Sequence, residues 1–355
     1  MNLTYSSDLW KYLASTDKTV VMYGMGNGAD KILAVCEKYN ITVSDFFASD
    51  GFVRGHSFHG KVVLSYSQIK EKYGADNIIV LLSFASSLPE VLENIYRIAS
   101  ECELYAPDVP VCDGPLFNLE FYNANLEMIN KVRSLLADET SVNIYDKVIA
   151  YKLTGDLSYL RLAEVDKSET YSLLGADQFS AIADLGAYNG DTVREIMSIS
   201  HGLSEVYAFE PDRRSFRKLS EFCSTVSGSP AIHPINAAAW SQDTEISFGD
   251  EGNRNSGICA KAKTVTVSAR SLDGILEGKA VDYIKYDVEG AEKQAIIGCE
   301  KTILAHRPKL LVSAYHRSED IFELPLQIHA LRPDSKLYFR RYPYIPAWDL
   351  NLLCI

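Results

Sequence analysis

Two segments of the chain share one order of elements: a short apolar strand, a glycine-containing turn and a helical period. The first segment runs from Lys18 to Lys38 and the second from Ser180 to Ser200. Further apolar strands and helices alternate after each of them. Such alternation is typical of a parallel sheet covered by helices, because each parallel connection must cross a face of the sheet. The sequence therefore predicts an α/β protein with two Rossmann-like units.

The alternation is interrupted once, in the middle of the chain. Residues 106–113 (APDVPVCD) carry two prolines and break the pattern. Helical runs follow at 119–136 and 141–154. A chain of 355 residues is long for one domain, since about 100–200 residues per domain is usual. We expect the chain to divide into three parts, which are a Rossmann-like N-terminal domain at 1–110, a helical connector at 111–170 and a larger α/β domain at 171–355.

The larger domain contains seven predicted strands. They lie at 181–186, 205–210, 232–238, 281–287, 309–315, 336–341 and 349–355, with helices between them at 192–200, 213–225, 291–305 and 319–331. The loop 342–348 is so short that it can join only antiparallel neighbours. This predicts a seven-stranded, mostly parallel sheet with an antiparallel last strand. A polar insertion, 249–263, interrupts the alternation after the third strand.

Composition excludes several classes of protein. The net charge of −12 opposes binding to nucleic acid or to an anionic membrane face, since both require a basic surface. No segment approaches the length of about 20 apolar residues that a membrane span needs. The N-terminus does not resemble a signal peptide, and the seven cysteines form no Cys-x-x-Cys pair. We expect a cytoplasmic protein with reduced thiols and no structural zinc.

The turn after the strand 181–186 is the strongest signal of a site. Gly186 and Gly190 allow the backbone to approach a ligand closely, at the edge of the sheet where open α/β proteins bind ligands. Glu210 ends the next strand, where a carboxylate can accept both hydroxyls of a ribose. The Gly-x-x-x-Gly spacing differs from that of pyrophosphate-binding turns. Asp184 just before it would repel a pyrophosphate but suit an ammonium group.

A third motif, VDYIKYDVEGAE at 281–292, ends the fourth strand and enters a helix. Together with SLD at 271–273 and RPKLLVSAYH at 307–316, it resembles the FkbM family of S-adenosylmethionine-dependent methyltransferases over residues 182–355. The resemblance implies a class I methyltransferase fold and S-adenosylmethionine as cofactor. It also implies O-methylation of a hydroxyl on a sugar, a glycan or a related small molecule. The pair Tyr188-Asn189 departs from the small or aliphatic residue of the family.

The resemblance also implies a cofactor site built at the ends of four strands. The residues that it assigns to the cofactor are Asp184, Gly186 and Gly190 at the methionine end, Glu210 at the ribose, Asn236 and Ala237 beside the adenine, and Asp287 at the sulfonium.

Methyl transfer to a hydroxyl needs a base, because a hydroxyl is a poor nucleophile while it keeps its proton. The two candidates for this catalytic role are His316, at the end of the fifth strand, and Asp287, at the end of the fourth. We favour His316. The alternative for His316 is a structural histidine that caps the following helix.

Asp287, Glu289, Glu292 and His316 together offer ligands that Mg²⁺ accepts. Glu289 and Glu292 also lie at a helix start, where carboxylates complement the helix dipole. A divalent metal is therefore compatible with these residues, but we predict none.

The residues that would surround the acceptor belong to no recognisable motif. The insertion 249–263 and the loop 342–348 are expected to shape the acceptor pocket. Arg340 and Arg341 end the sixth strand, where they could meet an acidic acceptor, and we expect a solvated strand end instead.

The N-terminal turn, Gly24 to Ala29, leaves a second interpretation open. It approximates a dinucleotide fingerprint, and Asp50 follows at the spacing of the ribose-binding acid. The chain would then be an NAD-dependent oxidoreductase or a non-catalytic protein that binds a cofactor or a nucleotide-sugar. The same domain could instead serve as a docking or dimerisation surface, so a homodimer is a further hypothesis.

Overall fold

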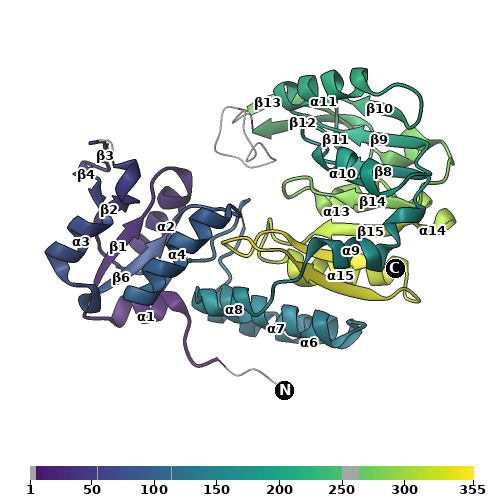
Figure 1. The fold of residues 1–355 in the computed structure, drawn as a ribbon. Coiled ribbons are helices and arrows are strands. Elements are labelled where there is room, and N and C mark those ends of the chain that lie inside the picture. Colours follow the sequence, from purple (N-terminus) through teal and green to yellow (C-terminus); the bar gives the residue numbers. More distant parts are fainter. Residues whose placement is uncertain (1–4, 54, 113, 250–263) are drawn as a thin grey trace.

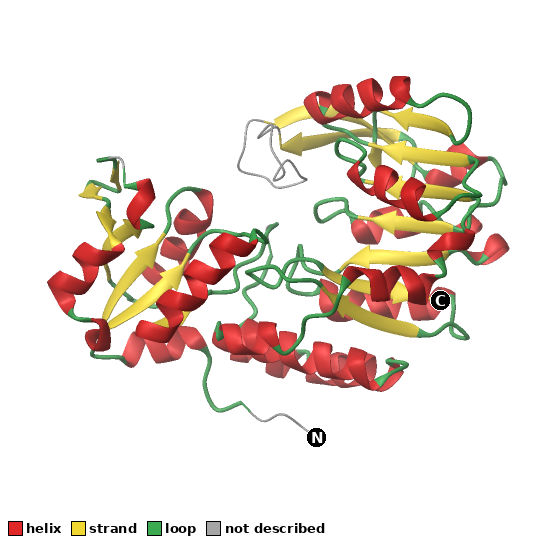
Figure 2. Cartoon of the chain, viewed as in Figure 1, coloured by secondary structure: helices red, strands yellow, loops and turns green. Residues whose placement is uncertain are grey.

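The computed structural model describes residues 5–53, 55–112, 114–249 and 264–355. Two α/β units, each built on its own sheet, lie side by side, and a group of helices runs beneath both (Figures 1 and 2). No helix among these residues is both long and apolar enough to cross a bilayer.

The N-terminal sheet has the strand order β5-β2-β1-β6-β7, with every pair parallel. Its strands are β1 (Thr19–Tyr23), β2 (Val43–Ala48), β5 (Leu64–Ser65), β6 (Ile78–Leu82) and β7 (Glu103–Tyr105). The helices around it are α1 (Leu9–Ser15), α2 (Asn27–Lys38), α3 (Tyr66–Tyr73) and α4 (Pro89–Glu101), and a small hairpin, β3 (Ser57–Phe58) and β4 (Lys61–Val62), lies beside them.

The connecting helices are α5 (Leu119–Ala124), α6 (Leu126–Leu135), α7 (Glu139–Thr154), α8 (Leu157–Arg161) and α9 (Lys167–Leu174). The single helix predicted at 119–136 is therefore wrong. It breaks at Asn125, whose amide donates 2.8 Å to the carbonyl of Phe121. Such a side chain competes with the helical backbone for its hydrogen bonds.

The C-terminal sheet confirms the predicted seven-stranded architecture. Its strand order is β10-β9-β8-β14-β15-β17-β16, and β17 is antiparallel to both neighbours while the other pairs are parallel. The strands are β8 (Ala181–Leu185), β9 (Glu205–Phe209), β10 (Ala231–Ile235), β14 (Tyr283–Tyr286), β15 (Lys309–Ser313), β16 (Leu337–Arg341) and β17 (Leu350–Cys354).

The helices of this unit are α10 (Asp191–Ile199), α11 (Arg213–Thr225), α12 (Leu272–Leu276), α13 (Glu292–Ile297), α14 (Glu300–His306) and α15 (Asp320–Leu331). The helix predicted at 291–305 is in fact two, α13 and α14, which meet at Gly298. A Cβ at Gly298 would lie 1.9 Å from the carbonyl oxygen of Trp240. The helix thus breaks where another segment of backbone approaches it.

A third sheet was not predicted. Its order is β11-β13-β12, from β11 (Ala238–Ala239), β12 (Thr244–Gly249) and β13 (Thr264–Arg270). The predicted strand 232–238 ends at Ile235, because the chain then turns into this third sheet. Most of the expected insertion, residues 250–263, lies outside the described residues.

Successive residues of each central strand point to opposite faces of the C-terminal sheet. Ile182 of β8 packs with α9, α10 and α11 on one face, whereas its neighbour Ala183 packs with α12 to α15 on the other. The second of these cores does not stop at the sheet. It continues through α5 to α8 to one face of the N-terminal sheet, where it includes Val21 and Val80. The two sheets therefore share one apolar core.

Arg340 and Arg341 are buried, at 3% and 0% exposure, so the expected solvated strand end is wrong. Arg340 reaches Asp138 at the start of α7 (2.7 Å) and Glu169 in α9 (2.9 Å). Arg341 lies 3.5 Å from Glu164 and donates to the carbonyl of Leu160. These guanidinium groups tie β16 to the connecting helices.

We expect Arg340→Ala to lower the free energy of unfolding by about 2–3 kcal/mol. This is less than the full cost of breaking a buried ion pair, because the carboxylates of Asp138 and Glu169 are partly exposed. Arg217→Ala, which removes an exposed pair with Glu221, should cost less than about 0.5 kcal/mol. Urea unfolding followed by circular dichroism compares the two. Equal losses would show that the buried pairs of Arg340 contribute no stability.

Candidate active site

A cavity of about 340 Å³ opens at the carboxyl ends of the C-terminal strands. Parallel strands place these ends along one edge, where their loops converge. The residues that line it include Gly186, Glu210, Ala239, Asp287, His316 and Trp348.

Gly186 makes the close approach between the loops that follow β8 and β14. Its φ is +93°, and a Cβ there would lie 1.9 Å from the carbonyl oxygen of Asp287. No other residue type fits, so the position requires glycine. Gly190 has φ +85° but faces the ring of Phe222 and is not part of the cavity wall. The two glycines thus have different tasks: one borders the cavity and the other packs the turn against α11.

Glu210 lies on the cavity wall with 7% exposure. Its two oxygens accept hydrogen bonds from the backbone N–H groups of Tyr188 and Asp212, each at 2.8 Å. Burial raises the pKa of Glu210 to about 8, although these hydrogen bonds act in the opposite direction. The side chain is therefore fixed in place by the chain itself and offers acceptor atoms to a ligand.

Asp287 and Asp184 both lie close to one half-buried cation, Lys285, which also lines the cavity. Lys285 Nζ is 3.2 Å from Asp287 and 3.7 Å from Asp184. Burial would raise the pKa of Asp287, but Lys285 and then His316 outweigh burial, so this pKa is lowered. Asp287 consequently faces the cavity as a carboxylate, which suits a cationic ligand.

Asp184 is placed deeper than the sequence suggests. It is 1% exposed and lies beneath the cavity rather than on its wall. Burial raises the pKa of Asp184 to about 6, with Lys285 acting against that rise. The structure brings Asp184 next to Lys285 and leaves Asp287 as the acid that a ligand would meet.

Asn236 and Ala237, the residues expected beside an adenine, lie just off the cavity. The amide of Asn236 donates to the carbonyl of Glu210 at 2.8 Å, and Ala237 is buried. The wall at this place is formed by the next two residues, Ala238 and Ala239. The sequence holds no signal for this two-residue displacement, since it follows from the unpredicted turn into β11.

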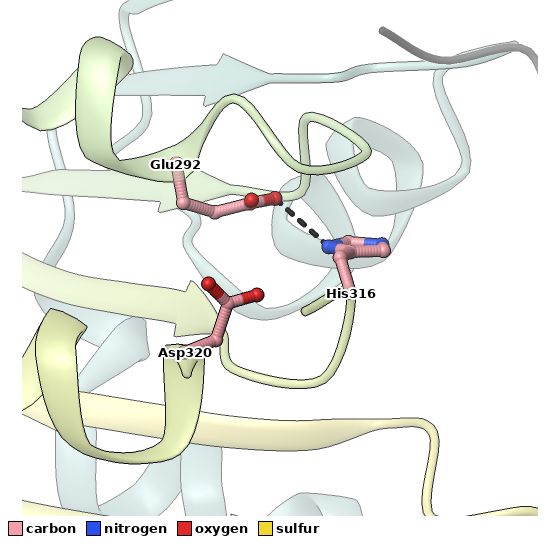
Figure 3. A group of neighbouring side chains, drawn as sticks. All are labelled: Glu292, His316 and Asp320. Carbon is pink, nitrogen blue, oxygen red and sulfur yellow. Dashed lines mark ion pairs between the residues drawn. The ribbon is translucent and has the colours of Figure 1, made fainter. Parts of the chain in front are cut away.

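His316 lines the cavity together with the carboxylates Asp287 and Glu289, and two further carboxylates, Glu292 and Asp320, lie behind its ring (Figure 3). His316 Nδ1 is 2.9 Å from Glu292, while Nε2 is 3.6 Å from Asp287 and 3.5 Å from Glu289. Glu292, His316 and Asp320 offer donor atoms within 4.8 Å of one another, a set that could hold a cation. Sequence reasoning missed Asp320, whose only signal is its place four residues after His316.

His316 is not the cap of the following helix. Helix α15 begins at Asp320 with Glu319 as its N-cap residue, and no side chain caps it. The ring of His316 instead turns towards the carboxylates, and its backbone carbonyl accepts from the N–H of Cys112 at 3.0 Å. His316 therefore lies on the cavity wall and does not cap α15.

The N-terminal unit also borders the cavity, which the sequence did not predict. Ser86 and Ile345 exchange two backbone hydrogen bonds, at 2.8 and 3.0 Å, so the loop after β6 joins the loop between β16 and β17. Ser87 and Val111 line the cavity from this side. The loop 342–348, expected to shape the pocket, contributes Tyr344 and Trp348 beside them.

The glycine turn at 24–29 has a structural explanation. A Cβ at Gly28 would lie 2.1 Å from the carbonyl oxygen of Ser83, so α2 packs tightly against the end of β6. Asp50, the expected ribose acid of a dinucleotide site, accepts from the hydroxyl of Ser67 in α3 at 2.9 Å.

Comparisons with known proteins agree with this geometry. Residues 184–340 match the family model described as "Methyltransferase FkbM domain". Methyltransferase FkbM from Methylobacillus flagellatus KT has a similar structure, with a TM-score of 0.72 and 21% identity over 95% of this chain and 90% of that chain. The shared fold thus includes the N-terminal unit. A comparison with curated proteins gives no match.

More distant structures cover about half of the chain. An rRNA methylase from Streptococcus thermophilus has a TM-score of 0.34 and 13% identity over 52% of this chain and 93% of that chain. Fibrillarin from Aeropyrum pernix, solved with natively bound S-adenosyl-L-methionine, has a TM-score of 0.34 and 15% identity over 53% of this chain and 74% of that one.

The sheet with one antiparallel strand and the cavity at its carboxyl edge are those of a Rossmann-like methyltransferase fold. Residues 184–340 therefore match a methyltransferase FkbM domain, and the chain as a whole has the fold of a methyltransferase FkbM structure.

We expect Gly186→Ala to abolish binding of S-adenosylhomocysteine and to lower stability by about 2–3 kcal/mol, since it adds backbone strain and a clash. Gly51→Ala is the matched control, because nothing lies within 4 Å of its Cβ position. Calorimetric titration and thermal unfolding report both effects. Normal binding by Gly186→Ala would show that the loop after β8 does not hold the cofactor.

Proposed function

We propose that this methyltransferase transfers a methyl group to a hydroxyl of a sugar, a glycan or a related small molecule, with His316 as base. The observation that carries the proposal is a single cavity wall that presents an ionised acid, Asp287, beside a buried imidazole, His316. The first suits a cation and the second suits the proton of an acceptor.

The residues on the wall fit S-adenosylmethionine. Glu210 has the position and the acceptor atoms for ribose hydroxyls, and Gly186 brings the loop after β8 against the backbone of Asp287 at the cavity wall. Asp287 matches the positive charge of a sulfonium, and the methyl groups of Ala238 and Ala239 offer a flat apolar surface to an adenine. Asp184 would act on the cofactor only indirectly, through Lys285.

The protein itself has only two chemical tasks, alignment of the acceptor and removal of its proton. When bound, S-adenosylmethionine supplies an electrophilic methyl group, so that an O–CH₃ bond forms while the S–CH₃ bond breaks and its electron pair stays on sulfur. The hydroxyl proton passes to Nε2 of His316. The protein aligns the acceptor oxygen and removes this proton, and alignment alone can supply much of the acceleration.

The acceptor side of the cavity is aromatic. Trp348 lies with its ring centroid 6.3 Å from that of Tyr315 and 5.6 Å from that of Tyr344, at interplanar angles of 24° and 32°. Lys167 and Asp349 line the same cavity. Aromatic faces pack against the C–H faces of a sugar ring, while the charged groups bind its hydroxyls. This combination supports a hydroxylated acceptor of sugar type.

The acceptor would enter between the two units. Ser87 and Val111 come from the N-terminal side of the cavity, whereas Tyr344 and Trp348 come from the C-terminal side. The net charge of −12 favours a small molecule or glycan over nucleic acid as the partner.

The first test is calorimetric titration of the protein with S-adenosylhomocysteine. We expect micromolar binding that Glu210→Ala weakens at least about tenfold, because the hydrogen bonds of the ribose hydroxyls to its carboxyl group are lost. Asp50→Ala, which removes the acid of the N-terminal turn, should bind normally. Acceptors are then sought by measuring S-adenosylhomocysteine released with a panel of glycosides.

A different result would favour the second interpretation. If the intact protein binds NAD or a nucleotide-sugar but not S-adenosylhomocysteine, and Asp50→Ala loses that binding, the N-terminal turn is the ligand site. Release of S-adenosylhomocysteine only with amine acceptors would contradict O-methylation while keeping the cofactor.

A further inference from the structure

The imidazole of His316 separates the cavity from a buried pair of acids. His316 lines the cavity, whereas Glu292 and Asp320 do not, and all three are 1% exposed. Figure 3 shows the two carboxylates on the side of the ring that carries Nδ1. Buried charges are paired or bind a metal, and His316 is the side chain that lies beside both acids.

Each acid is anchored by the turn from which it comes. Glu292 opens α13, and its Oε1 accepts from the N–H of Val288 at 3.0 Å. Asp320 opens α15 and accepts from the N–H of Arg317 at 2.8 Å. Both carboxylates are therefore held in place before any ligand binds, which is what the orientation of a catalytic group requires.

We propose, on the basis of the proposed function, that Glu292 is a positioning residue for His316. It holds the ring through Nδ1 and leaves Nε2 as the atom presented to the acceptor hydroxyl. Nδ1 of His316 lies 2.9 Å from Glu292, without the alignment of a hydrogen bond in the structure. Catalytic hydrogen bonds are often poorly aligned until the ligand is bound.

The charges around His316 support this assignment. Burial would lower its pKa, but Glu292, then Glu289 and then Asp287, raise the pKa of His316 to about 10. Lys285 lies on the far side of Asp287, and the Tyr315 ring centroid is 4.2 Å from that of His316. A cation bound at Asp287 would oppose the rise, so cofactor binding favours the neutral ring that can accept a proton.

Asp320 distinguishes this arrangement from a metal site. Burial first, and Glu292 next, raise the pKa of Asp320 to about 8, so the group is mostly protonated at neutral pH. With Asp320 neutral, the ion pair of Glu292 and His316 leaves the three groups without net charge. Asp320→Asn therefore mimics the neutral group under the proposal, but removes a ligand if a cation binds here.

The test follows the His316 ring by NMR in the intact protein labelled in its histidines. His316→Gln identifies the resonances among the seven histidines. We expect Glu292→Gln to lower the proton affinity of His316 at least about tenfold, and Asp320→Asn to change it less than about threefold. Glu323→Gln, whose exposed carboxylate pairs with Lys293 in the same region, is the control and should change nothing.

Three results would overturn the proposal. One is an ordinary pKa of His316 in the wild-type protein, which needs no variant to detect. Another is an unchanged pKa in Glu292→Gln. The third is stoichiometric broadening of the His316 resonances by Mn²⁺ that Asp320→Asn abolishes, which would establish a metal site instead.

Titration of each variant with S-adenosylhomocysteine separates this inference from the proposed function. If the wild-type protein binds S-adenosylhomocysteine but the pKa of His316 is unchanged in Glu292→Gln, only the positioning role of Glu292 is refuted. Absence of binding in the wild-type protein refutes the proposed function, whatever the NMR shows.

Discussion

The apolar core that the two sheets share is the interaction on which the site depends. It runs from one face of the N-terminal sheet through α5 to α8 to one face of the C-terminal sheet. Helix α7 lies in its middle and is buried along most of its length. Because side chains in such a core are close-packed, the two units cannot move apart without opening it. The loop after β6 is thereby held against the loop between β16 and β17, where Ser86 pairs with Ile345, and the cavity receives a wall from each unit.

Within that frame, charge decides what each carboxylate at the edge of the sheet can do. Lys285 lies between Asp184 and Asp287 and takes part of the negative charge of both. Asp184 is completely enclosed and Asp287 is not, so the same lysine stabilises a buried acid on one side and an exposed binding group on the other. Burial raises the pKa of both Asp184 and Glu210, and at Asp184 the charge of Lys285 acts against that rise. The carboxyl ends of the strands therefore present two acids of different proton affinity, Glu210 and Asp287, to one cavity.

Much of this could be predicted from the sequence, because it follows from local patterns. Apolar runs located the seven strands, and the short loop after Arg341 fixed the antiparallel one. The close approach at Gly186 and the acid at Glu210 follow from residue type and spacing. Features that depend on long-range packing could not be predicted. The depth of Asp184, the displacement from Asn236 and Ala237 to Ala238 and Ala239, and the burial of Arg340 and Arg341 are set by segments far away in the chain. Asp320 and Ser87 carried no motif at all, and only the fold brings them to the site.

The buried acids are difficult to explain as stabilising features. Replacing a buried ion pair by apolar residues of similar size is often neutral or stabilising, by about 1–4 kcal/mol. Glu292, His316 and Asp320 could thus be exchanged for a better core, and the surrounding α13 and α15 already pack through Ala295, Ile296 and Phe322. A chain that keeps three ionisable groups there accepts a loss of stability, as proteins do where activity requires it. His316 is the member of this cluster that lines the cavity, and that position is the physical reason to look for the role of the cluster in proton transfer rather than in folding.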